Sequence, residues 1–360
     1  MPRSSCSLLL IPIFVYLVSA AHAQRPALSP HDAERGAPRQ KHLTAVETVL
    51  GAEVANALLP PLRCDAKGNF YVQTEPYGVS TLRKLGPKGE RLSLFKSDSD
   101  ATLKVLAAPY FALSPVGDVY QLVLTGDVTR YILVFRGNGS YVRTIKLQPG
   151  LAWMPSAFLP LQSGNLLMTG QEYDRDPQKA RWPFTGIFSA DGKLLKELKL
   201  EGDEEIHQLG VRGDSRVTGP EDPANNRAVG FTQMEMAGDG NVYLMRWLSP
   251  AIIYGISPGG EVVRHFTVDP GDQNYRPAAM HISGNRIAIL FYQPQTMAEV
   301  MRVVDLEGHK LTTYDGESDD TNRLGSLGIA YACYISIPER FTFLGIGDSG
   351  AMEIKTVEAR

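Results

Sequence analysis

Short apolar runs that alternate with glycine-containing turns recur along the chain from about residue 42 to the C-terminus. The run "CDAKGNFYV" (64–72) is typical, because Gly68 and Asn69 favour the positive φ of a tight turn and Phe70-Tyr71-Val72 form a β-prone strand. Near-copies follow at 114–122, 161–169, 237–245 and 282–290. This recurrence predicts an internally repeated, all-β fold.

A second motif, a glycine shortly before another β-prone run, alternates with the first. Five glycines belong to each series: 68, 117, 164, 240 and 284 to the first, and 89, 139, 192, 260 and 308 to the second. Each unit therefore predicts four antiparallel strands, A to D, with glycine turns between A and B and between C and D. A single such sheet exposes two edges and cannot bury both faces, so we expect the sheets to pack radially as propeller blades.

The two ends of the repeat region predict how the ring closes. The last unit supplies only three strands, at 328–336, 340–346 and 351–357, whereas a spare β-like segment lies at 42–50. We expect a six-bladed β-propeller over residues 42–360, with the last blade closed by the N-terminal strand. A short helix over residues 45–58 is the alternative for this segment.

The repeat resembles the NHL-repeat and related six-bladed propellers. The resemblance covers about residues 42–360 and rests on "DAKGNFYV…RKLGPKGERLSLF" and "AGDGNVYLM…YGISPGGEVVRHF". It implies the propeller fold, and it implies one possible activity, that of the lyases or hydrolases found among such propellers. For that activity the polar residues expected to line the central channel are Arg63, Glu235 and His281.

The N-terminus has the form of a secretory signal peptide. Arg3 precedes an apolar stretch from Leu8 to Val18, and Ala21-His22-Ala23 offers a cleavage site. We expect residues 1–23 to be removed and residues 24–41 to be flexible, which places the protein in the periplasm or outside the cell. An uncleaved anchor is the alternative; after cleavage we expect no membrane span.

The net charge argues against one class of partner, and the number of cysteines excludes one class of fold. The formal net charge is −3, and removing residues 1–23, which hold one arginine and no acid, makes it −4. This balance argues against a nucleic-acid partner, which requires a clustered basic face. Only Cys64 and Cys333 remain after cleavage, which excludes a disulfide-dense scaffold. They could pair in an oxidising compartment or simply be buried as small apolar residues.

Several motifs suggest chemistry but fit the repeat better as turns. "GISPG" (255–259) places Ser257 in the column of C–D turns, followed by a strand, whereas a nucleophile elbow requires a helix there. "GIGDSG" (345–350) places Ser349 in the B–C turn of the last blade. The acidic runs 201–205 and 315–320 lack EF-hand spacing. Glu235, with Gln233 and His281, forms a thin ligand set, so we expect no cofactor, with calcium as the one open possibility.

The longest connections predict where a ligand binds. An insertion at about 201–227 and a long B–C loop at 171–182 both lie on the B–C/D–A loop face, over blades 3 and 4. Aromatic and arginine residues, which recognition surfaces favour, map to the same face: Trp153, Tyr173, Arg175, Trp182, Arg246, Trp247, Tyr275 and Arg276. The alternative is that the tryptophans fill space between blades beneath long loops.

These patterns favour a non-enzymatic, exported propeller that binds a protein, peptide or small ligand over blades 3 and 4. The rival interpretation is an enzyme whose site is the central channel. The two interpretations predict different channels. Three or more polar side chains converging on one point favour the enzyme, and an apolar channel beneath an aromatic rim favours binding.

Overall fold

The computed structural model describes residues 41–54, 58–73, 81–127, 129–150, 153–172, 182–211, 231–296, 298–315, 331–347 and 349–359. The predicted signal peptide, most of the predicted flexible segment, Tyr173 and Arg175 lie outside these residues. The described residues belong to one compact unit that starts at Gln40. Among them, no helix has the length and apolar character that crossing a bilayer requires.

The strands form blades of four antiparallel strands in sequence order. Blades 1 to 3 comprise β2 (Leu59–Cys64), β3 (Phe70–Gln73), β4 (Thr81–Leu85) and β5 (Arg91–Lys96); β6 (Val105–Leu113), β7 (Val119–Thr125), β8 (Arg130–Phe135) and β9 (Tyr141–Lys146); and β10 (Trp153–Pro160), β11 (Leu166–Glu172), β12 (Trp182–Phe188) and β13 (Leu194–Glu197). A helix, α1 (Asp203–Val211), follows blade 3 within the predicted insertion.

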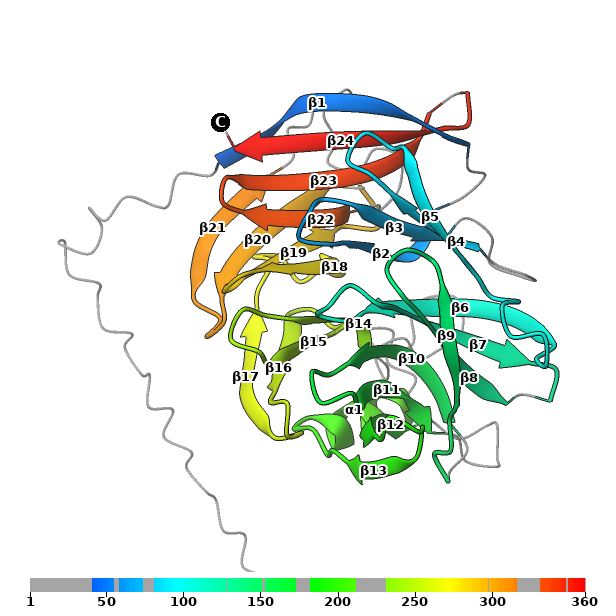
Figure 1. The fold of residues 1–360 in the computed structure, drawn as a ribbon. Helices are drawn as coiled ribbons and strands as arrows, with labels where there is room; N and C mark the ends of the chain where they lie inside the picture. The colour runs from blue at the N-terminus through cyan, green and yellow to red at the C-terminus, as the bar shows by residue number, and fades with distance from the viewer. Residues whose placement is uncertain are drawn as a thin grey trace, which may run out of the picture. The chain divides into compact units, whose positions relative to one another are not determined.

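Blades 4 to 6 complete the ring. They comprise β14 (Phe231–Met236), β15 (Val242–Arg246), β16 (Ala251–Ile256) and β17 (Val262–Val268); β18 (Arg276–Ser283), β19 (Arg286–Tyr292), β20 (Glu299–Asp305) and β21 (Lys310–Asp315); and β22 (Tyr331–Ser336), β23 (Glu339–Ile346), β24 (Ala351–Ala359) and β1 (Lys41–Val54). Each innermost strand contacts the innermost strand of the next blade, and β22 contacts β2, so the ring is closed (Figure 1). The chain is a six-bladed β-propeller, as predicted.

The last blade takes its fourth strand from the N-terminal region. β1 pairs antiparallel with β24 from Leu43↔Ala359 to Val54↔Ala351, and these two strands, blue and red, lie side by side in Figure 1. At its start β1 also pairs in parallel with β21 of blade 5, through Lys41↔Tyr314 and His42↔Asp315. The helix considered for residues 45–58 is therefore wrong for residues 45–54, which form a strand.

The ring is also closed covalently. Cys64 on β2 and Cys333 on β22 form a disulfide between the innermost strands of the first and last blades, with Cα atoms 5.4 Å apart. This spacing is within the range that disulfides adopt. Of the two possibilities that the sequence left open for these cysteines, pairing is the one observed. The bond and the β1–β24 pairing both hold the two ends of the propeller together.

The ten motif glycines all have positive φ, between 58° and 93°, but the two series differ in their surroundings. A Cβ on Gly117, Gly164, Gly240 or Gly284 would meet nothing within 4 Å. By contrast, a Cβ on a second-motif glycine would run into the preceding blade; at Gly192 it would overlap the carbonyl oxygen of Lys146 on β9. The C–D turns are therefore blade-to-blade contacts, whereas the A–B turns are open.

This difference predicts unequal costs for one substitution at two glycines of equal φ. Gly164 and Gly192 have φ of 83° and 84°, so an alanine at either position loses about 1 kcal/mol to the left-handed backbone. Gly192→Ala must also displace the Lys146 carbonyl, which adds about 1–3 kcal/mol. Urea denaturation of both variants measures the difference. Equal free energies of unfolding would contradict the proposed role of the C–D turns.

Candidate functional site

The structure separates the residues predicted for the B–C/D–A loop face into buried and accessible groups. Trp153 is 1% exposed and packs between Phe184 and Phe188, with ring centroids 5.0 and 5.4 Å away. Arg246 is fully buried, where it forms an ion pair with Asp203 of α1 and lies over the ring of Tyr254. Trp153 thus fills space in the core, and Arg246 anchors α1 to blade 4.

The other described residues of that set lie nearer the surface. Trp182 is 39% exposed and stacks on His207 of α1, with ring centroids 3.5 Å apart. Trp247, Tyr275 and Arg276 are half-buried. Ligand binding by these residues is untested and stays a prediction.

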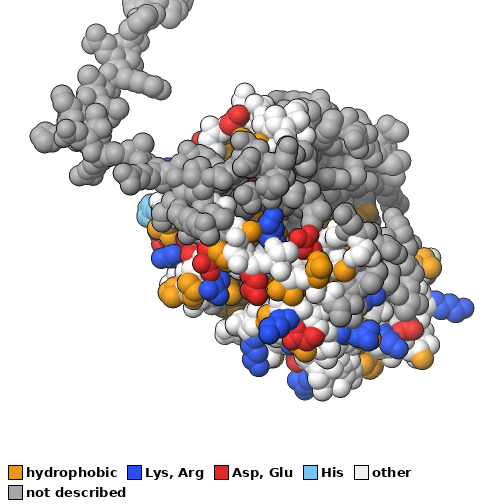
Figure 2. Space-filling model, turned by 90° about the horizontal axis from the view of Figure 1, so that it is seen from above, with side chains coloured by type: hydrophobic (Ala, Val, Ile, Leu, Met, Phe, Trp, Pro, Cys, Tyr) orange, Lys and Arg blue, Asp and Glu red, His pale blue; other side chains and the backbone are white. Residues whose placement is uncertain are grey.

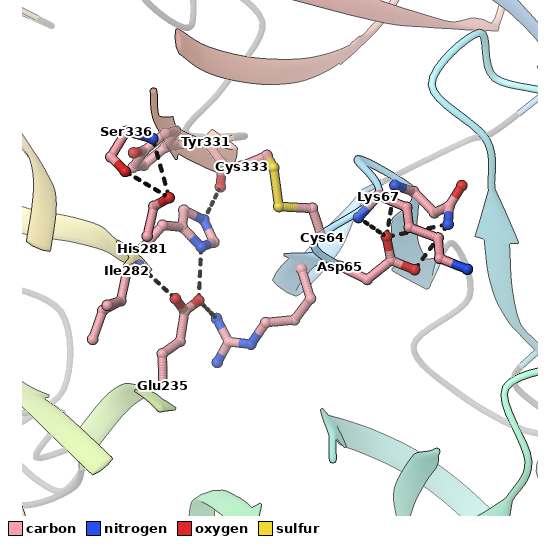
Figure 3. The surroundings of a disulfide bond; sticks show 12 residues. Cys64, Asp65, Lys67, Glu235, His281, Ile282, Tyr331, Cys333 and Ser336 are labelled. Atoms are coloured by element: carbon pink, nitrogen blue, oxygen red, sulfur yellow. Dashed lines mark hydrogen bonds and ion pairs between the residues drawn. A yellow bond between two sulfur atoms is a disulfide. The ribbon is translucent and has the colours of Figure 1, made fainter. Parts of the chain in front are cut away.

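The three residues predicted for the central channel converge on one carboxylate. Glu235 Oε1 accepts hydrogen bonds from Arg63 Nη1 at 3.2 Å and from His281 Nδ1 at 2.7 Å. Glu235 Oε2 accepts one from the Ile282 backbone N–H at 2.7 Å. Figure 3 shows Glu235 and His281 beside the disulfide, with the dashed contacts between them. The side chains come from β2, β14 and β18, so this network joins blades 1, 4 and 5.

The network holds a buried carboxylate between the side chains of Arg63 and His281. Burial acts to raise the pKa of Glu235, but the charge and hydrogen bond of His281, the charge of Arg63 and the Ile282 N–H outweigh it, and the pKa is lowered. Burial lowers the pKa of Arg63, against the attraction of Glu235. His281 Nε2 also lies 3.1 Å from the carbonyl oxygen of Tyr331. Both partners of the His281 ring, the Glu235 carboxylate and the Tyr331 carbonyl, are hydrogen-bond acceptors.

A cavity of about 550 Å³ lies directly over this network, a size typical of small-molecule sites. Its floor includes Arg63, Glu235 and Ile282. Its walls are the A–B turns of blades 1 and 2, at 65–67 and 114–117, together with Lys84. The cavity is therefore the mouth of the central channel on the A–B turn face, and none of the six described residues among the eight predicted for the opposite face lines it.

The second carboxylate of the cavity, Asp65, is as fully engaged as Glu235. It accepts a hydrogen bond from the Lys67 backbone N–H (Figure 3). It also accepts one from the Asn69 backbone N–H, and it forms an ion pair with Lys84 at 3.3 Å. Burial acts to raise the pKa of Asp65, but hydrogen bonds from Asn69, Lys67 and Lys84 outweigh it, and the pKa is lowered. Both acids are thus committed as acceptors within the protein.

The oxygen atoms of Gln233 and Glu235, two residues of the ligand set considered for calcium, already accept hydrogen bonds within the protein. Gln233 Oε1 accepts the Met280 backbone N–H, and both oxygens of Glu235 are occupied. Asp305, Glu307 and His309, in the C–D turn of blade 5, lie within 4.8 Å of one another. There Asp305 already accepts two backbone N–H groups of its own turn. Calcium binding stays untested, as does the absence of any cofactor.

The serine motifs lie in turns, as predicted. Ser257 Oγ donates to Glu261 at 2.6 Å, and its carbonyl accepts the Gly260 N–H of the C–D turn. Ser349 lies in the turn between β23 and β24. Charges of both signs are interspersed over the described part of the face in Figure 2, and the expectation of no nucleic-acid partner stays untested.

Comparisons with known proteins place the chain by fold alone. No protein-family model matches the chain, and no curated protein matches its sequence. Among solved structures, it is similar to a candidate exported protein from Bacteroides fragilis, with 9% identity, a TM-score of 0.52, and coverage of 90% of this chain and 97% of that one. A protein of unknown function from Bacteroides caccae has 11% identity and a TM-score of 0.49, covering 81% and 97%.

Proposed function

We propose that the protein is an exported, non-enzymatic propeller that binds a small ligand in the cavity at the channel mouth. The observation that supports this most is the position of Arg63. Its side chain is nine-tenths buried on the floor of a cavity open to solvent, and it is held there by Glu235. Burying a guanidinium beneath an open cavity costs free energy of desolvation. Binding of a ligand by this group is a reason for the protein to have an arginine at this position.

Binding fits this geometry better than acid–base catalysis does. A general base needs an accessible lone pair, but both oxygens of Glu235 and both nitrogens of His281 are engaged within the protein. The lowered pKa of Glu235 also disfavours a role as general acid near neutral pH. The convergence of Arg63, Glu235 and His281 on one point is the arrangement that we expected of an enzyme, but these side chains bond to one another and to the backbone.

Export is supported by three observations. The N-terminus has the pattern of a signal peptide, the Cys64–Cys333 disulfide suits an oxidising compartment, and one structural neighbour is described as a candidate exported protein. Fractionation of cells expressing the full chain, with mass measurement of the mature N-terminus, tests this proposal. Mature protein beginning at Gln24 outside the cytoplasm is the expected result.

A fragment screen by thermal shift, using neutral, anionic and cationic compounds, tests the location of the site. Met236 lines the cavity and Met154 does not, so Met236→Trp fills the site while Met154→Trp is the matched control. We expect a set of fragments that raises the melting temperature of the wild type and of Met154→Trp but not of Met236→Trp. The proposal fails if no fragment binds, or if Met236→Trp responds as the wild type does.

The B–C/D–A loop face is a second candidate location, favoured by one observation. Trp182 and His207 form a flat, partly exposed stack, which can serve as an aromatic platform. Fragments that bind there would lose their effect in Trp182→Ala and keep it in Met236→Trp, so the same screen separates the two faces.

A further inference from the structure

The charged groups of the channel-mouth cavity differ in how many hydrogen-bonding positions they leave for a ligand. Its two carboxylates, Asp65 and Glu235, accept hydrogen bonds or ion pairs at every oxygen. The cationic residues of the cavity, by contrast, have N–H donors without a partner in the network. The guanidinium of Arg63 makes two hydrogen bonds, to Glu235 and to the Met234 carbonyl, out of five possible N–H donors.

Two lysines add further donors to the same cavity. Lys84 forms an ion pair with Asp65 at 3.3 Å and also bonds to Tyr71, so these two partners use only part of its ammonium group. Lys67 is exposed at the rim, where its backbone N–H, rather than its ammonium group, bonds to Asp65. Donors therefore remain for a ligand, whereas the carboxylate acceptors are committed.

The charge balance of the lining points the same way. Three cationic residues (Arg63, Lys67 and Lys84) and two anionic residues (Asp65 and Glu235) line the cavity, which leaves one net positive charge. A monovalent anion complements this charge. The attraction between the anion and a cation of the lining would be strongest beside the buried Arg63, because the surroundings are least hydrated there.

The rest of the lining is largely apolar and reaches the surface. Val116, at the tip of the A–B turn of blade 2, is 83% exposed. Six apolar side chains of the lining come from four blades: Leu113, Pro115, Val116, Leu159, Met236 and Ile282. Together they offer an apolar wall above a cationic floor.

From this arrangement we infer that the ligand is an amphipathic monoanion, with a carboxylate-like head on Arg63 and an apolar body against the turns of blade 2. This inference rests on the proposed function, because it assigns a chemical class to the ligand of the same cavity. The binding step is non-covalent and requires no other reactant.

A matched set of probes tests the class directly. Calorimetric titration compares 4-phenylbutyrate with 4-phenylbutanol and 4-phenylbutylamine, which share its skeleton, and with acetate, which shares its head group. We expect 4-phenylbutyrate to bind at least tenfold more tightly than each of the other three. Lys67→Met removes one cation of the lining without breaking a side-chain bond that holds the network, and it should weaken 4-phenylbutyrate about threefold to tenfold. Lys88→Met, an exposed lysine in the C–D turn of blade 1 that does not line the cavity, is its control.

The outcomes separate this inference from the proposed function. If the alcohol or the amine binds as tightly as the acid, and Met236→Trp abolishes that binding, the cavity is a ligand site but the monoanion class is wrong. If acetate binds as tightly as 4-phenylbutyrate, the apolar part of the inference is wrong. Equal effects of Lys67→Met and Lys88→Met would overturn the role of the net positive charge of the lining. If no probe binds and the fragment screen is also negative, the proposed function itself fails.

Discussion

Loss of the Cys64–Cys333 disulfide is expected to lower the free energy of unfolding by about 4–5 kcal/mol, because the bond closes a loop of 269 residues in the unfolded chain. The folded ring should persist without it, since the β1–β24 pairing closes the last blade independently. Urea denaturation with and without a thiol reductant measures the loss.

The double variant Cys64→Ala/Cys333→Ala separates the bond from its side chains. It should match the reduced wild type, and added reductant should not change it further. A wild-type protein whose stability is the same in both conditions would show that the disulfide contributes nothing to ring closure in solution.

Replacing Glu235 with glutamine is expected to cost about 3–5 kcal/mol, because it removes the anion between a buried arginine and a buried histidine. The substituted amide cannot relieve this loss. With its NH₂ group in the place of Oε1 it meets Arg63 and His281, and in the place of Oε2 it meets the Ile282 N–H. Either orientation brings donors against donors.

Urea denaturation of Glu235→Gln at pH 7 tests this expectation, with Glu261→Gln as the control. Glu261 is an exposed carboxylate that bonds to Ser257 and Lys196, so its loss should change stability by no more than about 0.5 kcal/mol. Equal effects of the two substitutions would show that the network around Glu235 is not a stabilising unit.

The pH dependence of the same measurement follows from the lowered pKa of Glu235. A carboxyl whose pKa is lower in the folded than in the unfolded protein stabilises the fold above the unfolded value and loses that contribution as pH falls through the folded value. The wild type should therefore lose stability below about pH 4.5. The difference between the wild type and Glu235→Gln should shrink over the same range.

The architecture could be predicted because it depends on local chemistry that repeats. Turn glycines such as Gly68 and Gly192 require positive φ, and their alternation along the chain counts strands and blades. Even the closure by β1 follows from a missing strand. The cysteine pairing could not be decided in the same way, because it depends on two inner strands, β2 and β22, meeting across the seam.

The candidate site could be predicted only in part, for a physical reason. Arg63, Glu235 and His281 occur on inner strands, so their convergence follows from the blade geometry once the ring is known. Lys67 and Lys84 carry no comparable signal, because Lys67 lies in the A–B turn of blade 1 and Lys84 is the last residue but one of strand β4. Burial of Trp153 and Arg246 likewise depends on how α1 and blade 3 pack, which residue type alone does not reveal.

A crystal structure of the protein soaked with 4-phenylbutyrate tests the central claim most directly. The proposed site predicts the carboxylate within hydrogen-bonding distance of Arg63, with the phenyl ring beside Val116 and Met236, and Glu235 still bonded to His281. Density for the compound on Trp182 and His207, with an empty channel mouth, would contradict the claim and favour the opposite face of the propeller.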